Sequence, residues 1–398
     1  MAEKFVIGAQ NICRICNGEI ESLWELGSLA LTGHFPSPGE TIPEAPLSVG
    51  QCLDCSLVQL LHHYSSTTFF GENYGYRSGL NNSMVKHLKD LVTSVDAIID
   101  IQDGDVVVDI GGNDGTTLSC YEKKVAKVLV DPTADNWRPF ISSDITVIPE
   151  FFCGPEQLNG RQAKLITTIS MLYDLPNPRA FVRSIHQSLA EGGYWLCEQS
   201  DLGMMMDVNS FDTICHEHLE YYSRPVLLAL AAAEGFHMVH ESTNATNGGS
   251  RRFLFQKKSE HGEYIVPDVG NLLDAQRRQF LQLSTFVDEL REDVETLLFS
   301  KQHHGLGAST KGNTLLQLLG INHALIPYVA EINPDKLGKT TPGTNIPIIS
   351  EVESKQKCPE AYFVLPWHFK EHFVSRADLK DSFTLTFPLP RLVSIPPK

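Results

Sequence analysis

The architecture of this chain follows from VVVDIGGNDGTTL (residues 106–118). A run of valines leads into Asp109, a glycine-rich turn comes next, and TTL then starts a helix. The turn has the pattern D-x-G-x-N-x-G, formed by Asp109, Gly111, Asn113 and Gly115. Glycine lets a backbone approach a ligand closely and take positive φ angles, and the following helix presents free N–H groups beside that ligand. The stretch therefore predicts a strand, a ligand-binding turn and a helix.

An acid at the end of the next strand narrows the choice of ligand. The strand KVLVD (127–131) ends in Asp131, whose carboxylate can accept two hydrogen bonds from a ribose diol. The glycine spacing is not the G-x-G-x-x-G of dinucleotide sites, and no P-loop lysine follows. Turn and acid together indicate the S-adenosylmethionine (SAM) site of a class I methyltransferase; an NAD-type site or a structural turn are the alternatives. The residues predicted to hold the cofactor are Asp109, Gly111, Asn113, Asp114, Asp131, Phe151, Ser170 and Met171, with Phe152 next to Phe151 at the adenine.

Strand-like runs and helical stretches alternate on both sides of this turn. The further candidate strands, which give the alternation typical of a doubly wound sheet, are 164–170, 194–199, 237–242 and 251–256. A helix is predicted over 269–302, where apolar residues recur at three and four positions, and residues 303–398 alternate again. We therefore expect an α/β protein with three domains: a small cysteine-bearing unit at 1–65, a class I (Rossmann-like) methyltransferase domain at 66–265, and a connector helix with a smaller Rossmann-like unit at 266–398.

Four of the nine cysteines form two C-x2-C pairs near the N-terminus. Tetrahedral zinc takes four thiolates about 2.3 Å from the metal, and each pair supplies two of them from one tight turn. Cys13, Cys16, Cys52 and Cys55 are therefore predicted to hold a structural Zn²⁺, because four thiolates leave no open position for catalysis. The alternative is that four reduced cysteines pack as small apolar residues.

The composition argues against several classes of protein. A formal charge of −16 disfavours binding to nucleic acid or to anionic membranes, because both depend on basic surface. No run of 18 apolar residues predicts a transmembrane helix, and the first residues, MAEKFVIGAQNICRIC, lack the apolar core of a signal peptide. We expect a cytosolic monomer or homodimer with a small-molecule partner.

A second stretch, FDTICHEHLEYYS (211–223), places a Cys, two His and two Glu within six positions. With it in view, the chain resembles over nearly its whole length the three-domain SAM-dependent sugar C-methyltransferases. These are the C-3 methyltransferases of nucleotide-linked deoxysugar pathways and the related tetronitrose enzyme. The matching landmarks are the two C-x2-C pairs, ENYGYRSG (72–79), DIGGNDGT (109–116), FDTICHEHLEYYS, NGGSRR (247–252), GASTKGNT (307–314), INPDKLGKTTPGTNIPI (332–348) and LPWHF (365–369).

The resemblance implies that a proton is abstracted before the methyl group is transferred. A 4-keto group acidifies the neighbouring sugar C–H, and loss of that proton gives an enolate, so the site needs a base and a donor to the enolate oxygen. Glu217 and His218 match the family's Glu-His pair, with His218 as general base and Glu217 orienting it or sharing its proton. Tyr76 is the expected donor to the sugar or enolate oxygen, with Tyr74 as its competitor for contact with the substrate.

Two positions depart from the tetronitrose-type enzyme. Cys215 stands where that enzyme has a Tyr, and Asp174 stands where it has a His, so His216 or Asp174 is expected to replace them in the proton relay. Methylation of a hydroxyl group by an O-methyltransferase is one alternative function. A non-catalytic zinc-containing binding protein with a vestigial SAM fold is the other.

The resemblance also implies that the C-terminal domain helps to hold a nucleoside diphosphate sugar. GLGASTKGNT (305–314) leads into a helix whose N-terminus suits an anionic diphosphate. The basic candidates for contacts to the substrate are Lys311, Arg251 or Arg252, Lys339 or Lys336, and His368.

Overall fold

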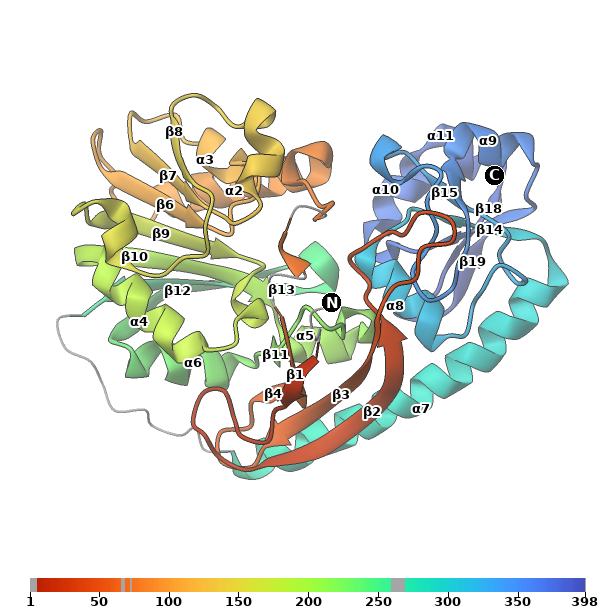
Figure 1. Ribbon diagram of the computed structural model, residues 1–398, viewed down its shortest axis with the longest axis horizontal. Helices are drawn as coiled ribbons and strands as arrows, with labels where there is room; N and C mark the ends of the chain where they lie inside the picture. The colour runs from red at the N-terminus through yellow and green to blue at the C-terminus, as the bar shows by residue number, and fades with distance from the viewer. Residues whose placement is uncertain (1–5, 66–68, 72–73, 259–268, 398) are drawn as a thin grey trace.

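The computed structural model describes residues 6–65, 69–71, 74–258 and 269–397. A seven-stranded central sheet and a six-stranded C-terminal sheet lie on either side of the molecule, and the N-terminal strands lie below and between them (Figure 1). Helix α7 (Gly270–Ser300) runs along the outside from the N-terminal strands to the C-terminal unit. The three predicted segments thus form three differently built parts of one molecule.

The central sheet is doubly wound, with the order β12-β13-β10-β9-β6-β7-β8. Its strands are β6 (Val106–Ile110), β7 (Ala126–Val130), β8 (Ile145–Ile148), β9 (Ala163–Ile169), β10 (Leu189–Ser200), β12 (Phe236–Asn244) and β13 (Ser250–Lys257). The first five are mutually parallel, whereas β13 runs antiparallel to β10 and β12 antiparallel to β13. The strand order reverses between β6 and β9, so their carboxyl ends open the crevice where ligands bind in such sheets.

Helices and short 3-10 helices (η) fill the connections of the central unit. They are η1 (Ser78–Leu80), α2 (Asn82–Asp96), α3 (Thr116–Ser119), η2 (Ala134–Phe140), η3 (Pro155–Leu158), η4 (Leu172–Asp174), α4 (Pro178–Ser188), α5 (Leu202–Asp207), η5 (Phe211–Thr213), α6 (Arg224–Ala233) and η6 (Thr246–Gly248). Two of these elements begin beside the central crevice: α3 follows β6, and η4 follows β9.

The C-terminal sheet repeats the doubly wound plan, with the order β16-β15-β14-β17-β18-β19. Its strands are β14 (His303–Leu306), β15 (Val329–Glu331), β16 (Ile348–Ser350), β17 (Ala361–Val364), β18 (Thr384–Phe387) and β19 (Val393–Ile395). Its helices are α8 (Thr310–Leu318), η7 (Pro334–Lys336), α9 (Glu351–Gln356), η8 (Trp367–Phe369), α10 (Lys370–Ser375) and α11 (Ala377–Lys380). In chain order this is the 3-2-1-4-5-6 arrangement of a Rossmann fold, so the expected Rossmann-like unit is present.

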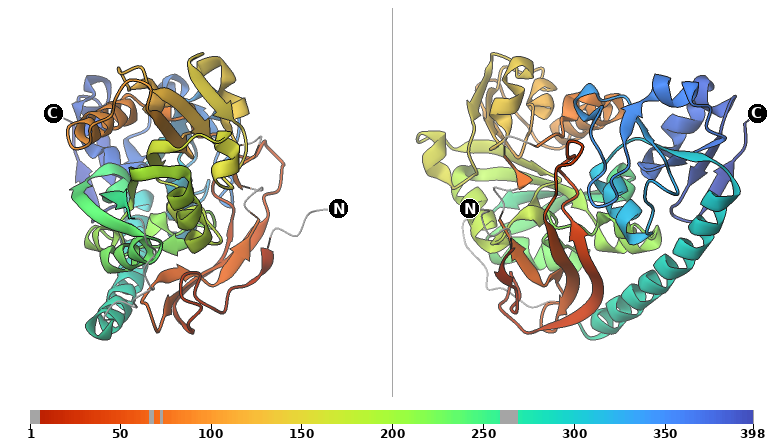
Figure 2. Two further views of the ribbon diagram at one scale, coloured as in Figure 1. Left: turned by 90° about the vertical axis from the view of Figure 1, so that its left-hand side faces the viewer. Right: turned by 45° about the vertical axis from the view of Figure 1, so that its right-hand side comes forward.

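The N-terminal strands form a two-stranded sheet and a four-stranded sheet, and the larger sheet borrows one strand from the central unit. The elements here are β1 (Val6–Ala9), β2 (Ile20–Ala30), β3 (Glu44–Cys52), β4 (Val58–Leu60), β5 (His62–Tyr64) and β11 (Glu220–Tyr221). β11 belongs to the HEHLEYY stretch and pairs antiparallel with β4. Figure 2 shows the loop between β2 and β3 reaching the C-terminal unit, where Asn313 Nδ2 donates to Thr32 O at 2.8 Å.

Helix α7 matches the predicted connector closely. Its fully buried residues recur every three or four positions, which gives one apolar stripe: Gln276, Phe280, Leu283, Val287, Leu290, Val294 and Leu298. The stripe belongs to one continuous apolar core that also contains residues of β2, β3, α5 and the C-terminal sheet. α7 therefore holds the N-terminal and C-terminal parts together.

Candidate active site

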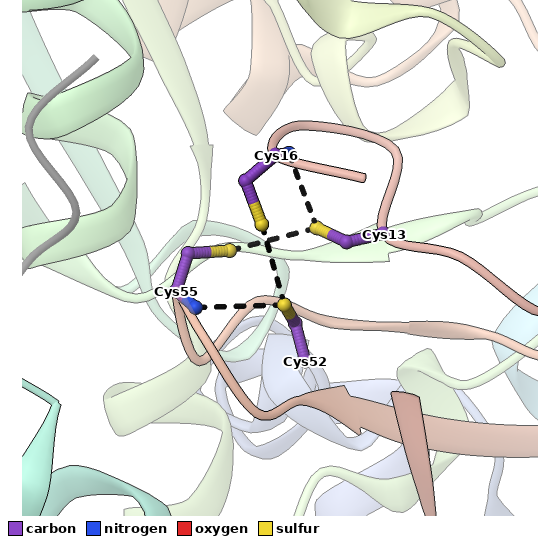
Figure 3. Close-up of side chains that lie close together, drawn as sticks. All are labelled: Cys13, Cys16, Cys52 and Cys55. Carbon is purple, nitrogen blue, oxygen red and sulfur yellow. Dashed lines mark hydrogen bonds between the residues drawn. The ribbon is translucent and has the colours of Figure 1, made fainter. Parts of the chain in front are cut away.

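The four cysteines of the two C-x2-C pairs meet at one point (Figure 3). The Sγ atoms of Cys13 and Cys55 are 3.5 Å apart, those of Cys16 and Cys52 are 3.4 Å apart, and all four lie within 4.8 Å of one another. Sulfurs bound tetrahedrally at 2.3 Å from zinc would be about 3.8 Å apart. Backbone N–H groups also point at the sulfurs, as that of Cys55 does at Cys52 Sγ at 3.4 Å. The four free thiols therefore fit a zinc ion, and zinc would tie the two turns together.

The first cysteine turn is joined to the HEHLEYY stretch by a buried ion pair. Arg14 Nε lies 3.3 Å from Glu220 Oε1, and both side chains are fully buried. Glu220 lies in β11, opposite Gln59 of β4, and Gln59 Oε1 accepts the backbone N–H of Arg14 at 2.9 Å. The predicted zinc site is thus connected to the segment that carries Glu217 and His218.

The glycine-rich turn has the geometry of a ligand-binding turn. Gly111 has φ 70°, and a Cβ added there would lie 2.9 Å from the Cγ of Met171. Asp131 Oδ2 accepts the backbone N–H of Asn113 at 2.7 Å, which ties the acid of β7 to the turn after β6. Only glycine fits at position 111, so Met171 can lie directly against the turn at the switch point of the sheet.

Asn113 and Asp114 hold a neighbouring segment. Asn113 Oδ1 accepts the backbone N–H of Ser78 at 2.9 Å and its Nδ2 donates to Tyr76 O at 3.0 Å. Asp114 Oδ2 accepts the backbone N–H of Gly79 at 2.9 Å. The described part of ENYGYRSG is therefore clamped over the glycine turn; Glu72 and Asn73 of that stretch lie outside the described residues. These two side chains position the cover of the cofactor site.

Asp109 supports the turn from beneath. It is 1% exposed, its Oδ1 accepts from Thr167 Oγ1 at 2.5 Å, and its Oδ2 is buried without a partner. Burial raises the pKa of Asp109 to about 7. A Cβ added at Gly112 would lie 2.5 Å from Asp109 Oδ2, so the carboxyl lies directly under the backbone of the turn.

The remaining predicted cofactor residues lie around the same crevice. Phe151 follows β8 and is 40% exposed, whereas Phe152 packs edge-on against Phe181 with ring centroids 5.8 Å apart. Ser170 follows β9 in a left-handed conformation, with φ 53°, and its backbone N–H donates to Glu198 O at 2.7 Å. Phe151 is thus free to line an adenine pocket, while Phe152 is partly committed to packing.

His218 is oriented by a backbone carbonyl. Its Nδ1 lies 2.7 Å from Thr213 O, and since a carbonyl oxygen can only accept, Nδ1 carries the hydrogen and Nε2 is the basic nitrogen. Burial lowers the pKa of His218 to about 4, against the bond to Thr213. Among the described residues no hydrogen bond is made to Nε2. A neutral imidazole therefore presents its acceptor nitrogen to the site.

Glu217 contacts the N-terminal loop rather than the ring of His218. Thr32 Oγ1 donates to Glu217 Oε2 at 3.2 Å, and a Cβ added at Gly33 would lie 2.7 Å from Oε1. Burial raises the pKa of Glu217. Glu217 also shares a hydrogen bond with the buried Cys215, whose thiol has a pKa raised well above its usual range by burial and then by Glu217. The loop after β2 thus packs against the 211–223 segment, and no motif in the sequence indicates this contact.

His216 faces away from Glu217 and His218. It is fully buried, its Nε2 lies 3.1 Å from Ala45 O of β3, and its ring meets that of Tyr64 edge-on at 5.1 Å. Burial lowers the pKa of His216 to about 4. This geometry supports an anchoring role against the N-terminal sheet in place of the predicted role in the proton relay.

Asp174 and Tyr74 lie on the same side as Glu217. Burial raises the pKa of Asp174 well above its usual range, and the charges of Glu217 and Glu220 act in the same direction. Burial likewise raises the pKa of Tyr74, followed by Asp174 and, more weakly, by Asp131 and Glu217. Tyr76, by contrast, is 47% exposed. Of the two tyrosines, Tyr74 is the one on whose ionisation Asp131, Asp174 and Glu217 all act.

The C-terminal unit reaches the central unit at two points. Lys311 Nζ donates to Asn247 O at 2.7 Å, and Trp367 Nε1 donates to Asp212 Oδ2 at 2.7 Å inside the protein. The neighbouring His368 has a buried, unpaired Nδ1, and burial lowers its pKa to about 3, with Lys311 acting in the same direction. Lys311 and His368 therefore lie together at the junction of the two Rossmann-like units.

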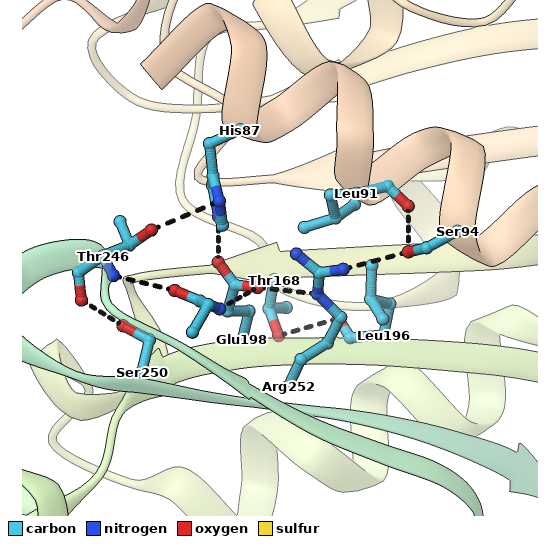
Figure 4. Close-up of polar contacts among 10 residues, drawn as sticks. His87, Leu91, Ser94, Thr168, Leu196, Glu198, Thr246, Ser250 and Arg252 are labelled. Atoms are coloured by element: carbon cyan, nitrogen blue, oxygen red, sulfur yellow. Dashed lines mark hydrogen bonds and ion pairs between the residues drawn. The ribbon is translucent and has the colours of Figure 1, made fainter. Parts of the chain in front are cut away.

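The arginines of NGGSRR are used inside the central unit. Arg251 bonds Asp201 Oδ2 at 2.7 Å and also Glu241. Figure 4 shows Arg252 and His87 converging on the buried Glu198, with Arg252 Nε 2.7 Å and His87 Nε2 2.5 Å from its carboxylate. These contacts tie both guanidiniums to acids of the central unit, and a role of either in binding phosphate stays a prediction.

The last two basic candidates lie beside η7. Lys336 Nζ donates to Ala308 O at 2.8 Å and lies over the ring of Phe35, so its ammonium is held at the turn after β14. Lys339 is half-buried and follows it in the same loop. Among the described residues, no contact places Lys339 at the catalytic segment.

Several residues of this junction carry no signal in the sequence. Thr32, Gly33 and Arg14 come from the N-terminal part, Trp367 from the C-terminal part, and Asp212 from the segment between them. The packing of the three parts brings Thr32 and Gly33 to Glu217, Arg14 to Glu220 and Trp367 to Asp212. Trp367 lies within the LPWHF landmark, which was the one available pointer to it.

Comparison with known proteins assigns a family description to each part. The family described as "Putative zinc binding domain" matches residues 13–70, "Methyltransferase domain" matches 84–241, and "C-methyltransferase C-terminal domain" matches 245–390. C-methyltransferase NovU of Streptomyces niveus is 27% identical over 409 residues, covering 96% of each chain. The three models follow one another in the order of the three observed parts.

Solved methyltransferase structures resemble part of the chain more distantly. The 1,6-didemethyltoxoflavin-N1-methyltransferase of Burkholderia thailandensis, with bound S-adenosylhomocysteine, is 14% identical over 46% of this chain and 81% of its own, with a TM-score of 0.36. The cyclopropane synthase MmaA2 of Mycobacterium tuberculosis is 13% identical over 48% of this chain and 93% of its own, with a TM-score of 0.36. Within the described residues, no helix is both long enough and apolar enough to span a membrane.

Proposed function

Because this chain is a SAM-dependent methyltransferase with a zinc-binding domain and the domain order of the C-methyltransferases, we propose that it methylates a carbon next to the keto group of a nucleotide-linked deoxysugar. The observation that carries this proposal is the state of His218. Its Nδ1 is held by Thr213 O, so that Nε2 faces the site as a neutral acceptor. Carbon needs such a base before it can attack a methyl group, whereas many heteroatoms do not.

The position of His218 also suits the reaction. Its ring meets that of Tyr173 with centroids 4.5 Å apart, and Met171, two residues earlier, lies against Gly111 of the cofactor turn. The base and the cofactor turn are therefore joined by one short segment at the switch point of the central sheet. Bound SAM would supply an electrophilic methyl group there.

The proposed reaction takes place in two steps. His218 Nε2 accepts the proton from the carbon beside the keto group, and the electron pair of the broken C–H bond forms the enolate. The enolate carbon then forms a bond to the methyl carbon as the S–CH₃ bond breaks, which restores the ketone, and His218 releases its proton to solvent. Glu217 stabilises the segment that carries the base, through Thr32 and Cys215.

The C-terminal unit has features that suit the nucleotide part of the proposed substrate. Glu331 ends β15 and its Oε2 accepts the backbone N–H of Ala308 at 2.8 Å, just as Asp131 follows β7 and accepts that of Asn113 at 2.7 Å. Each unit thus has an acid tied to the turn at its own switch point, the arrangement of nucleotide-binding sheets. The turn after β14 leads into α8, whose N-terminus favours phosphate.

Two basic side chains lie where a diphosphate would pass from that turn to the base. Lys311 is in the first turn of α8, and its Nζ reaches the central unit at Asn247 O. His368 lies after β17, the strand next to β14 in the sheet. A sugar attached to a diphosphate held at Lys311 would project toward His218, whose pKa Lys311 helps to lower.

Exchange of the substrate hydrogen with solvent tests the function directly. TDP-4-keto-6-deoxyglucose is incubated in D₂O with the enzyme and without SAM, and deuterium at the carbons beside the ketone is followed by NMR. We expect wash-in with the wild-type protein, and a loss of about 10²–10⁴-fold in His218→Asn, the range for removal of a general base. His240→Asn, which changes an exposed histidine on β12, is the matched control and retains the rate.

The outcomes separate the two methylation chemistries. Wash-in that requires His218, followed by formation of a new C–CH₃ bond on addition of SAM, supports the proposal. Methylation of a hydroxyl without any wash-in would contradict it and identify an O-methyltransferase. Binding of S-adenosylhomocysteine to His218→Asn, measured by calorimetry, checks that the variant retains its cofactor site.

A further inference from the structure

The segment Met171 to Asp174 connects the two halves of the reaction centre. Met171 lies against Gly111, and the ring of Tyr173 lies against that of His218. Tyr173 O accepts the backbone N–H of Leu219 at 2.7 Å, which fixes this segment to the one that carries the base. Asp174, the last residue of η4, therefore directly follows a segment that contacts both the cofactor turn and His218.

The carboxyl group of Asp174 lacks hydrogen-bond partners in the described part of the protein. Its Oδ1 is buried without a hydrogen-bond partner, and among the described residues its Oδ2 receives no hydrogen bond either. Glu217 accepts from Thr32, whereas Glu220 has no hydrogen-bond partner within the described ranges but has the charge of Arg14 3.3 Å away. A buried polar group without a partner is costly unless a ligand completes it.

The groups around Asp174 favour its uncharged form. Glu217 and Glu220 face Asp174 from the 211–223 segment. Burial raises the pKa values of Tyr74, Tyr173 and Cys215, and the charge of Asp174 adds to this effect. None of these is a cation at neutral pH. Burial raises the pKa of Asp174 well above its usual range, and the two glutamates add to this effect. A neutral carboxylic acid has one O–H donor that an ionised one lacks.

We propose that Asp174, as the protonated acid, is a further catalytic residue that donates a hydrogen bond to the keto oxygen while that oxygen becomes an enolate oxygen. This inference rests on the proposed function. As His218 Nε2 takes the proton from carbon, negative charge develops on the oxygen, and the O–H of Asp174 stabilises it. Asp174 keeps its proton throughout, so the balance of the two steps is unchanged.

Two other candidates in this region are engaged elsewhere. His216 is directed to Ala45 O and the ring of Tyr64 in the N-terminal sheet. Cys215 is buried and shares its hydrogen bond with Glu217. A carboxylic acid kept neutral by an apolar site is a known donor to enolate-like oxygens in other enzymes. Of the two residues expected in the proton relay, His216 and Asp174, the structure therefore favours Asp174.

Two substitutions distinguish a hydrogen-bonding role of Asp174 from a structural one. Asp174→Asn keeps a hydrogen-bond donor but cannot ionise, whereas Asp174→Ala has no donor. We expect Asp174→Ala to lower the rate of deuterium wash-in by about 10²–10³-fold, as when one oxyanion donor is removed. We expect Asp174→Asn to lower it by less than about tenfold. Binding of S-adenosylhomocysteine stays unchanged in both.

A purely structural role of Asp174 would not change the pH profile of deuterium wash-in, so this profile tests the proposal. In the wild-type protein the rate falls on the alkaline side as Asp174 loses its proton and with it the donor. Asp174→Asn lacks this fall, while Cys215→Ala retains it, which excludes the thiol as its source. Tyr74→Phe retains it for the same reason.

Either of two results would overturn the inference. One is wash-in by Asp174→Ala at the wild-type rate, and the other is an alkaline fall that persists in Asp174→Asn. If Asp174→Ala does not fold, as judged by circular dichroism, the profile of Asp174→Asn alone decides. A wild-type protein that shows no wash-in at any pH would instead reject the proposed function, and the role of Asp174 with it.

Discussion

Asp109 is a carboxyl group whose surroundings favour the protonated form. Its Oδ2 is buried without a partner beneath Gly112, and Thr167 donates to Oδ1. Burial raises the pKa of Asp109 to about 7, against about 3.9 in an unfolded chain. Between these values the folded protein binds more protons than the unfolded one, so this group makes the protein less stable as pH rises from 4 to 7.

Asp109→Asn therefore gains stability relative to the wild type as pH rises. The gain between pH 4 and pH 7 is at most about 4 kcal/mol, because three pH units at about 1.4 kcal/mol each set the limit. Urea denaturation followed by tryptophan fluorescence at several pH values measures it. The exposed Asp135→Asn serves as control, with a difference from wild type that stays nearly constant. A difference for Asp109→Asn that is also constant would reject the raised pKa.

The role of individual motif residues is the part that sequence resolves least well. Asp109, Asn113 and Asp114 all belong to the D-x-G-x-N-x-G pattern, and all were expected to hold the cofactor. The structure places Asp109 beneath the turn and uses the side chains of Asn113 and Asp114 to hold residues 76–79. A motif reports that these residues are needed together, whereas only packing decides which of them faces the ligand.

Elements with a strong pattern agree well between sequence and structure. The valine run at 106–110 is β6 without a shift, and the helix expected over 269–302 is α7 at Gly270–Ser300. β11 is different, because two residues cannot show an alternating pattern. Its pairing with β4 depends on the cysteine turns that hold β3 and β4, which is tertiary information.

This pairing predicts what removal of zinc does. The HEHLEYY segment is fixed by β4 and by the pair of Arg14 with Glu220, both next to the cysteine turns. Chelation of zinc should therefore abolish methyl transfer and deuterium wash-in, while S-adenosylhomocysteine still binds to the central sheet with an affinity changed by less than about tenfold. Calorimetry and NMR on the same chelated sample measure both, and added Zn²⁺ should restore the activity.

Two results would contradict this prediction. Full activity in protein with less than a tenth of an equivalent of zinc by metal analysis would show that the turns hold without the metal. A parallel loss of cofactor binding would show that zinc stabilises the whole molecule rather than one segment. Arg14→Met, which removes the ion pair but leaves the cysteines, should reproduce the loss of activity with zinc still bound.

At the scale of the whole molecule, all three parts contribute to the proposed reaction centre. The N-terminal loop supplies Thr32 to Glu217, the central sheet supplies the cofactor turn and Asp174, and the C-terminal unit supplies Trp367 to Asp212. The sequence predicted three domains in the correct order but not that each one contributes to the environment of His218. Contacts such as Thr32 to Glu217 join residues 185 positions apart, and no local pattern records them.

The bond from Trp367 to Asp212 is the contact through which the C-terminal unit can set the position of the base. Asp212 is fully buried and precedes Thr213, whose carbonyl holds Nδ1 of His218. Trp367→Phe keeps the packing of the ring but removes the donor, which leaves a buried carboxylate oxygen unpaired. Such a loss costs roughly 1.5–3 kcal/mol when the partner is charged.

We therefore expect Trp367→Phe to lower both stability and turnover, with kcat reduced by at least about tenfold because the base is displaced. Trp137→Phe is the matched control, since the Nε1 of Trp137 is buried without a hydrogen-bond partner and its removal breaks no bond. Thermal unfolding and steady-state kinetics on both variants measure the effects. If both variants lose the same stability and Trp367→Phe keeps the wild-type kcat, the C-terminal unit binds the substrate without positioning the base.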